Sequence, residues 1–167
     1  FGFTPRPEGI GYNPEAVLQH LLAITEQMPA GPIGLIGASM GGSVAVVLAR
    51  ALEDAQPQRI EKLLLLAPAG LTGKPMPLPP LLDRLGASFL GLPAVRRGLC
   101  RQAFADPDAA VGPAEEEIAS LHLSTPGWAA ALACFARSGG FAGVGAPLPA
   151  APIHVLWGAQ DRILRAP

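Results

Sequence analysis

The chain has 167 residues, of which 50% are hydrophobic and 15% charged, so it can bury the core of one folded domain. Its formal net charge is −1. With no basic block and no apolar run near the roughly 18 residues that a bilayer span requires, we expect no nucleic-acid partner and no membrane span. A small, neutral or apolar molecule is the expected ligand.

The first predicted element is a loop over residues 1–12, where proline and glycine recur at alternate positions. A helix is predicted to follow. Asn13 is a good N-cap, Pro14 suits the first helical position, and apolar residues then recur at helical spacing. Pro29 and Gly31 are expected to end this helix.

Three short apolar runs are predicted to be buried strands, at residues 33–38, 60–67 and 152–157. Each is too short for a typical helix, and the first suits a strand covered on both faces. The segment between the first two strands, residues 40–54, is predicted to be a helix whose first turn consists of small residues. Strand, helix and strand in this order imply a right-handed parallel unit, so we predict an α/β fold.

The sequence changes character between residues 70 and 151, where proline and glycine interrupt short apolar stretches. Residues 75–80 fit a linker that leads into an insertion of short helices. The stretches that fit these helices are residues 81–90, 95–104 and 128–137. We therefore predict a helical cap over residues 71–150 and a core domain made of residues 1–70 and 151–167.

Several side chains of the insertion are predicted to be structural. Cys100 and Cys134 are interpreted as buried free thiols, because two cysteines do not make a disulfide framework in a chain of this length. Two charged groups are interpreted as solvated parts of helices. One consists of Arg96, Arg97 and Arg101, for which a substrate anchor is the alternative, and the other of Glu115, Glu116 and Glu117.

A G-x-S-x-G pattern, Gly37-Ala38-Ser39-Met40-Gly41, lies where the first predicted strand meets the following helix. A serine on such a turn has strained backbone angles that lift its hydroxyl above the sheet, and we expect Gly37 and Gly41 to relieve crowding on either side. The Met40 N–H is expected to donate to a developing oxyanion, helped by the helix dipole. Ser39 is therefore predicted to be a nucleophile.

Two other interpretations of this turn stay open. Ser39 could cap the following helix, or the glycine-rich turn could bind phosphate. Phosphate binding is the weaker alternative, because a Walker-type loop has a lysine before its Ser or Thr and the G-x-G-x-x-G pattern is not matched.

The turn and its surroundings resemble the α/β-hydrolase superfamily, specifically members with a helical cap between the sixth and seventh strands of a parallel sheet with flanking helices. Residues 1–3 resemble the loop after the fourth strand, and the first two predicted strands resemble the fifth and sixth. The segment P-I-H-V-L-W-G-A-Q-D resembles the seventh strand and its acid loop. The resemblance implies that Asp161, after Gly158, is the triad acid; a loop or helix-capping aspartate is the alternative.

The family's triad also needs a histidine from a loop after the eighth strand, and no histidine follows Asp161 in this sequence. We therefore interpret the three histidines present, His20, His122 and His154, as structural or surface residues. The base is expected beyond Pro167 and the second oxyanion donor before Phe1. On this interpretation the chain is a central section of an enzyme.

The resemblance implies that Ser39 attacks an acyl carbon while Asp161 orients the histidine. The implied function is a serine hydrolase for an ester-like or other acyl bond of a small hydrophobic substrate, with no metal or organic cofactor. A cytoplasmic location is a separate expectation, which follows from the lack of an apolar run long enough to span a membrane. Cofactor-free haloperoxidases and carbon–carbon bond hydrolases share this triad and stay open, as does a non-catalytic ligand-binding protein. Three aromatic residues are predicted either to line the pocket or to form the cap core: Trp128, Phe135 and Phe141.

Overall fold

The computed structural model describes residues 11–164. These residues divide into two compact units. The sheet unit contains Asn13–Met76 and Gly139–Gly158, and the helical unit contains residues 11–12, Pro77–Ser138 and residues 159–164. The loop predicted for residues 1–12, including the part that resembles a family loop, therefore lies almost entirely outside the described residues.

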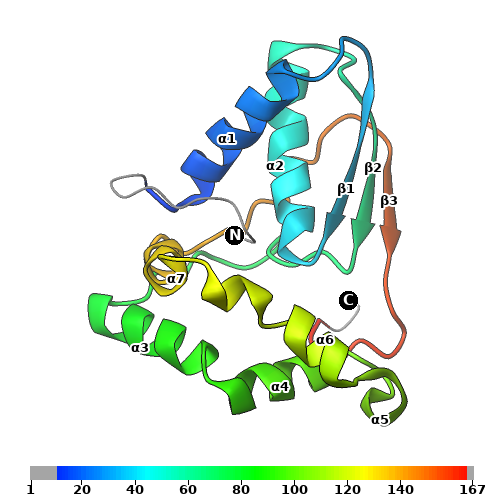
Figure 1. Cartoon of the computed structure of the whole chain (residues 1–167). Coiled ribbons are helices and arrows are strands. Elements are labelled where there is room, and N and C mark those ends of the chain that lie inside the picture. The colour runs from blue at the N-terminus through cyan, green and yellow to red at the C-terminus, as the bar shows by residue number, and fades with distance from the viewer. Residues whose placement is uncertain (1–10, 165–167) are drawn as a thin grey trace. The chain divides into compact units, whose positions relative to one another are not determined.

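The sheet unit contains three parallel strands in the order β1-β2-β3, which confirms the predicted α/β class. Their bounds are β1 Ile33–Ala38, β2 Ile60–Leu66 and β3 Ile153–Leu156. The pairing brings Ala38 beside Leu66, and Leu66 beside Leu156. All three strands therefore end at the same edge of the sheet, as Figure 1 shows.

Two helices of the sheet unit lie on one side of the sheet (Figure 1). They are α1, Pro14–Glu26, and α2, Met40–Ala55. Asn13 is confirmed as the N-cap of α1, since its Oδ1 accepts a hydrogen bond from the Ala16 N–H at 2.8 Å. The core packs one face of α2 against β2, and its buried members are Ala45, Val46, Leu48, Ala49, Leu52, Ile60, Leu63 and Leu65.

The face of the sheet that points away from α2 is uncovered in the described residues. Ile36 is 72% exposed and Leu156 is 59% exposed. Their pairing places both on the face opposite the buried Leu63 and Leu65. The prediction that the first strand is covered on both faces is therefore wrong for the described chain, because both helices of this unit pack on the same side.

The helical unit consists of six short helices. They are α3 Pro80–Leu90, α4 Pro93–Gln102, α5 Pro107–Ala110, α6 Pro113–Ile118, the 3-10 helix η1 Leu121–Ser124, and α7 Trp128–Arg137. The three helices predicted in the insertion correspond to α3, α4 and α7. Residues 71–76 and 139–150, which we assigned to the cap, lie in the sheet unit. Both cysteines are free thiols as predicted, Cys100 buried and Cys134 half-buried.

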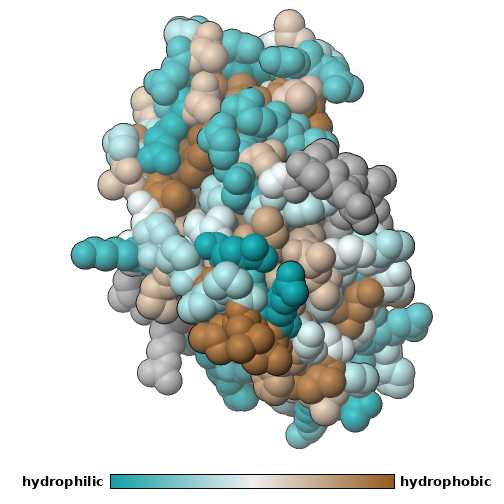
Figure 2. Space-filling model, turned by 90° about the vertical axis from the view of Figure 1, so that its left-hand side faces the viewer, coloured by the Kyte–Doolittle hydropathy of each residue, from teal (hydrophilic) through white to brown (hydrophobic). Residues whose placement is uncertain are grey.

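Helix α3 buries its small and polar side. Asp83 and Ala87 are 1% and 3% exposed, whereas Leu81 and Phe89 are 70% and 57% exposed. The apolar side chains that α3 leaves exposed contribute to the hydrophobic patch in the lower half of Figure 2. The side of α3 that packs inward is therefore the reverse of the one that its apolar periodicity favours.

No single helix within residues 11–164 combines the length and apolarity needed to cross a membrane. The segments Pro113–Ser124 and Trp128–Arg137 meet those criteria only as a pair, and they are bent by 83° relative to each other.

Candidate active site

Ser39 lies between the last residue of β1 and the first residue of α2, with φ 50° and ψ −125°. The predicted strained turn is confirmed, because a positive φ is rare for a residue with a side chain. Ser39 is exposed, and its hydroxyl makes no capping hydrogen bond to α2. The alternative interpretation, in which Ser39 serves as a side-chain cap, is therefore wrong.

The backbone of Ser39 is held on both sides by hydrogen bonds. Its N–H donates to the Leu66 carbonyl at 2.9 Å, and its carbonyl accepts from the Gly42 and Ala69 N–H groups, each at 2.9 Å. In a trans peptide the C=O and the following N–H point in opposite directions. The Met40 N–H therefore points away from Ala69, and as the first amide of α2 it has no partner within the helix.

The glycines of the turn differ in how closely they are packed. A Cβ at Gly37 would lie 2.3 Å from the Gly41 carbonyl oxygen, so a side chain there would collide with backbone, as predicted. A Cβ at Gly41 would meet no described atom within 4 Å, so the crowding expected at Gly41 is not found. The crowded position in α2 is Gly42, whose Cβ would lie 2.5 Å from the Pro68 Cβ.

Ala67 is a second strained residue at this edge of the sheet, with φ 40°. It follows Leu66 as Ser39 follows Ala38, and these two preceding residues are register partners. Strained non-glycine residues cluster at functional sites, so we add Ala67 to the candidate site. Nothing in the sequence signals this residue, because an alanine after an apolar strand is ordinary.

The predicted acid, Asp161, belongs to the helical unit. Its Oδ1 accepts hydrogen bonds from the backbone N–H groups of Ile163 and Leu164, at 2.9 and 2.8 Å. One carboxylate oxygen of Asp161 therefore caps the loop that follows it, as the alternative interpretation states. Its role as a triad acid stays a prediction.

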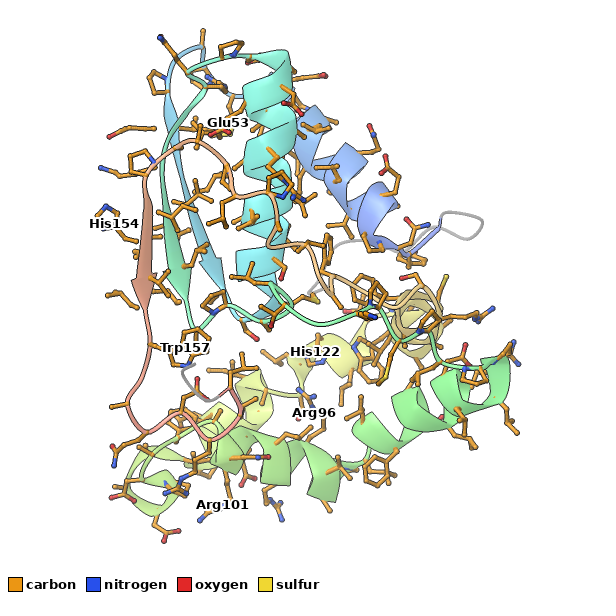
Figure 3. All side chains as sticks on the ribbon, turned by 180° about the vertical axis from the view of Figure 1, so that it is seen from behind. Glu53, Arg96, Arg101, His122, His154 and Trp157 are labelled. Carbon is orange, nitrogen blue, oxygen red and sulfur yellow. The ribbon has the colours of Figure 1, made fainter. Side chains whose placement is uncertain are left out.

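The three histidines lie in different settings. His20 is exposed on α1, and His154 is exposed on the side of β3 that points away from α2 (Figure 3). His122 is half-buried, with its ring centroid 5.6 Å from that of Trp128. The interpretation of all three as structural or surface residues stays a prediction, although the strand that carries His154 is more exposed than we expected.

The other candidate lining residues are divided between the two units, and two of the three are buried. Phe135, in the helical unit, is 7% exposed, and Phe141, in the sheet unit, is 6% exposed. Trp128 is half-buried at the start of α7. A role for these three residues in lining a pocket stays a prediction.

The arginines of α4 each have a partner within the helical unit, which disfavours a substrate anchor, but Arg96 is half-buried and so does not lie on the solvated helix face that we predicted. Arg96 and Arg101 are labelled in Figure 3. The contacts join Arg96 to the Ala119 carbonyl, Arg97 to Glu116 at 2.9 Å, and Arg101 to Asp108.

A cavity of about 410 Å³ lies at the end of the sheet opposite Ser39, lined by residues that precede β1 and β2. Its principal cationic group is Arg59, which is 7% exposed. The guanidinium donates to the carbonyls of Pro29 at 2.9 Å, Gly31, and Thr25 at 3.4 Å. Because these contacts hold the loop before β1, we interpret Arg59 as a structural residue rather than as part of the candidate site.

Comparisons with known proteins bear on this geometry. The sequence profile of the Alpha/beta hydrolase family matches residues 1–167. The 2-hydroxy-6-oxo-2,4-heptadienoate hydrolase of Pseudomonas putida is 33% identical over 72 residues, which make up 43% of this chain and 25% of that relative. The chain thus matches only a part of this curated relative.

Two solved structures share the fold. The 2-hydroxy-6-oxo-6-phenylhexa-2,4-dienoate hydrolase of Rhodococcus sp. strain RHA1 superposes with a TM-score of 0.71 at 21% identity, over 98% of this chain and 61% of that one. An esterase from Exiguobacterium antarcticum superposes with a TM-score of 0.68 at 17% identity, over 93% of this chain and 59% of the esterase chain. The chain thus spans about three fifths of each structure, and it belongs to the alpha/beta hydrolase family.

Proposed function

We propose that the full-length protein is a serine hydrolase in which Ser39 attacks the acyl carbon of a small hydrophobic substrate. The observation that carries the proposal is the positive φ of Ser39, 50°, at the N-terminus of a 16-residue helix. The exposed hydroxyl and the first amide of α2 then lie at the edge where all three strands end. Membership of a family of hydrolases supports the same class of reaction.

In the proposed mechanism, Ser39 Oγ adds to the carbonyl carbon while a histidine takes the hydroxyl proton. The Met40 N–H donates to the oxygen that becomes negatively charged, which lowers the barrier most when the donor is fixed in advance. The histidine then protonates the leaving group, and Asp161 holds the imidazole in the required orientation. Water completes the cycle by hydrolysing the acyl-enzyme.

We also propose that the helical unit is the cap domain. Its main segment, Pro77–Ser138, is inserted in the chain between β2 and β3. This position in the element order agrees with a cap between two consecutive strands of the family sheet.

A second candidate is the hydrolysis of a carbon–carbon bond beside a carbonyl, with a 2-hydroxy-6-oxo-dienoate as substrate. Two curated relatives carry names of this kind, the 2-hydroxy-6-oxo-2,4-heptadienoate and 2-hydroxymuconate semialdehyde hydrolases. The same nucleophile and oxyanion donor serve either reaction, because both begin at a carbonyl carbon.

The test is steady-state hydrolysis by the full-length protein of p-nitrophenyl esters from acetate to octanoate, with 2-hydroxy-6-oxo-2,4-heptadienoate as the carbon–carbon substrate. We expect Ser39→Ala to lower kcat/KM by about 10⁴-fold or more. Ser88→Ala, which removes another exposed serine, is the matched control and should retain full activity.

Turnover that survives Ser39→Ala would contradict the proposal. A wild-type protein that binds these compounds and turns over none of them would favour the non-catalytic binding protein. Relative kcat/KM values for the esters and the dienoate decide between the two substrate classes.

A further inference from the structure

The loop that follows β2 is joined to the turn at Ser39 by contacts that no sequence pattern indicates. The Ala69 N–H donates to the Ser39 carbonyl at 2.9 Å, and the Ala69 carbonyl accepts a hydrogen bond from the Ser43 hydroxyl. Pro68 packs so closely on Gly42 that a Cβ there would lie 2.5 Å from the proline Cβ. Both polar groups of the Ala69 backbone are thus bonded to α2 and its N-cap residue.

Ser43 is completely buried, at 0% exposure, one turn along α2 from Ser39. A serine inside a helix commonly bonds the carbonyl four residues before it, which here is that of Ser39. The Ser43 hydroxyl bonds instead to Ala69, and the Ser39 carbonyl receives the Ala69 N–H. The two hydrogen bonds therefore close a ring through Ser39, Ser43 and Ala69.

The close approach of the loop depends on Gly70. This residue has φ 80°, and a Cβ there would lie 2.7 Å from the Ser43 Oγ and 1.9 Å from the Phe141 carbonyl oxygen. Only glycine adopts such a position without displacing the hydroxyl or the backbone beside it. The loop after β2 is therefore built to bring Ala69 onto Ser43.

We propose that Ser43 is a positioning residue that fixes the Ser39–Met40 peptide for oxyanion stabilisation. The ring holds the Ser39 carbonyl, and peptide planarity then fixes the direction of the Met40 N–H. A donor fixed before the reaction stabilises the transition state without reorganising. This inference rests on the proposed function, because it assumes that Ser39 is the nucleophile and Met40 the donor.

The test compares Ser43→Ala and Ser43→Cys in the full-length protein, using kcat, KM and the inhibition constant of a trifluoromethyl ketone that forms a tetrahedral adduct with the active serine. We expect Ser43→Ala to lower kcat by about 10- to 100-fold with KM within twofold of wild type, since the donor is displaced rather than removed. The inhibitor should weaken by the same factor as kcat/KM. Ser43→Cys retains a weak donor of similar size and should give intermediate values.

Val46→Ala is the matched control, because Val46 is buried in the same helix as Ser43 and belongs to its hydrophobic core. It should lower the melting temperature and leave kcat unchanged. Unchanged kcat in Ser43→Ala would overturn the inference, as would an equal loss of kcat in Val46→Ala or a loss of kcat without weaker inhibition. If Ser39→Ala itself retains turnover, the proposed function has failed, and the role of Ser43 fails with it.

A measurement on the wild-type protein covers the case in which the Ser43 variants do not fold. Amide hydrogen exchange should be slow at Ala69, while Met40 exchanges fast in the free protein and slowly once the trifluoromethyl ketone is bound. A protected Met40 amide in the free protein would contradict the inference, because the donor would already have a partner.

Discussion

Asp83 on α3 and Arg137 on α7 form an ion pair with the Arg137 Nε 2.8 Å from Asp83 Oδ2. The Asp83 side chain is 0% exposed and that of Arg137 is 47% exposed, so the pair joins a fully buried anion to a cation at the surface. The Asp83 Oδ1 also accepts the Arg84 N–H at 2.6 Å. The pair joins the buried polar side of α3 to α7.

We predict that Arg137→Ala destabilises the protein by about 2–3 kcal/mol, because it leaves a buried carboxylate without its cation. The loss is smaller than for a fully buried pair, because the Arg137 side chain is 47% exposed and solvent screens its charge. Arg84→Ala removes a neighbouring exposed arginine and should change the free energy of unfolding by less than about 0.5 kcal/mol. Urea unfolding of both variants measures the difference. The double replacement Asp83→Leu with Arg137→Leu should recover most of the loss, and a cost for Arg137→Ala as small as that of Arg84→Ala would show that the pair contributes little.

The glycines at the turn give a second prediction. Gly37→Ala places a Cβ 2.3 Å from the Gly41 carbonyl oxygen, so the turn must shift. We expect a loss of about 2–4 kcal/mol in unfolding free energy, together with loss of activity. Gly41→Ala meets open space and should be neutral or stabilising by up to about 1 kcal/mol, because alanine favours the helix. Equal effects of the two substitutions in thermal unfolding would contradict this packing.

The described strands, their connecting helix and the strained turn could be predicted from sequence because their signals are local. An apolar run, a G-x-S-x-G and a following helix occupy neighbouring positions in the chain. The contacts of Ser43 with Ala69 could not be predicted, since the partners are separated by many residues and neither type is unusual. The positive φ of Ala67 could not be predicted either. For the same reason we expected crowding at Gly41, whereas the structure has it at Gly42, against Pro68.

The orientation of α3 could not be predicted for a related reason. Leucines at helical spacing indicate a buried face, yet the partner of α3 within its unit is α7, whose Arg137 pairs with Asp83. The side of α3 that carries Asp83 is buried there in place of the apolar side. Periodicity also could not show which face of the strands is covered, because a short apolar run is the same whether one face or both are packed.

The pH dependence of the start of α6 is a third prediction. The Glu115 carboxylate accepts the Gly112 N–H at 2.9 Å, and this backbone hydrogen bond lowers the pKa of Glu115 below its ordinary value of 4.5. Because the folded pKa is the lower one, the stabilisation is fully present above pH 4.5 and is lost as the pH falls through the folded pKa. A carboxyl titration of Glu115 by NMR should give a midpoint below 4.5.

The Gly112 amide should shift with the same midpoint in that titration. In Glu115→Gln the shift should vanish, since the amide side chain does not titrate in this range. A Glu115 midpoint at or above 4.5 would contradict the hydrogen bond as the cause.

The central claim is that Ser39 is an activated nucleophile, and covalent labelling tests it most directly. We predict that the full-length protein reacts with a fluorophosphonate probe and that mass spectrometry of the digested adduct finds the label on Ser39, because only an activated serine attacks such a probe at a useful rate. Ser39→Ala should abolish labelling, while Ser88→Ala should leave it unchanged. A label found on another residue, or labelling that survives Ser39→Ala, would contradict the account.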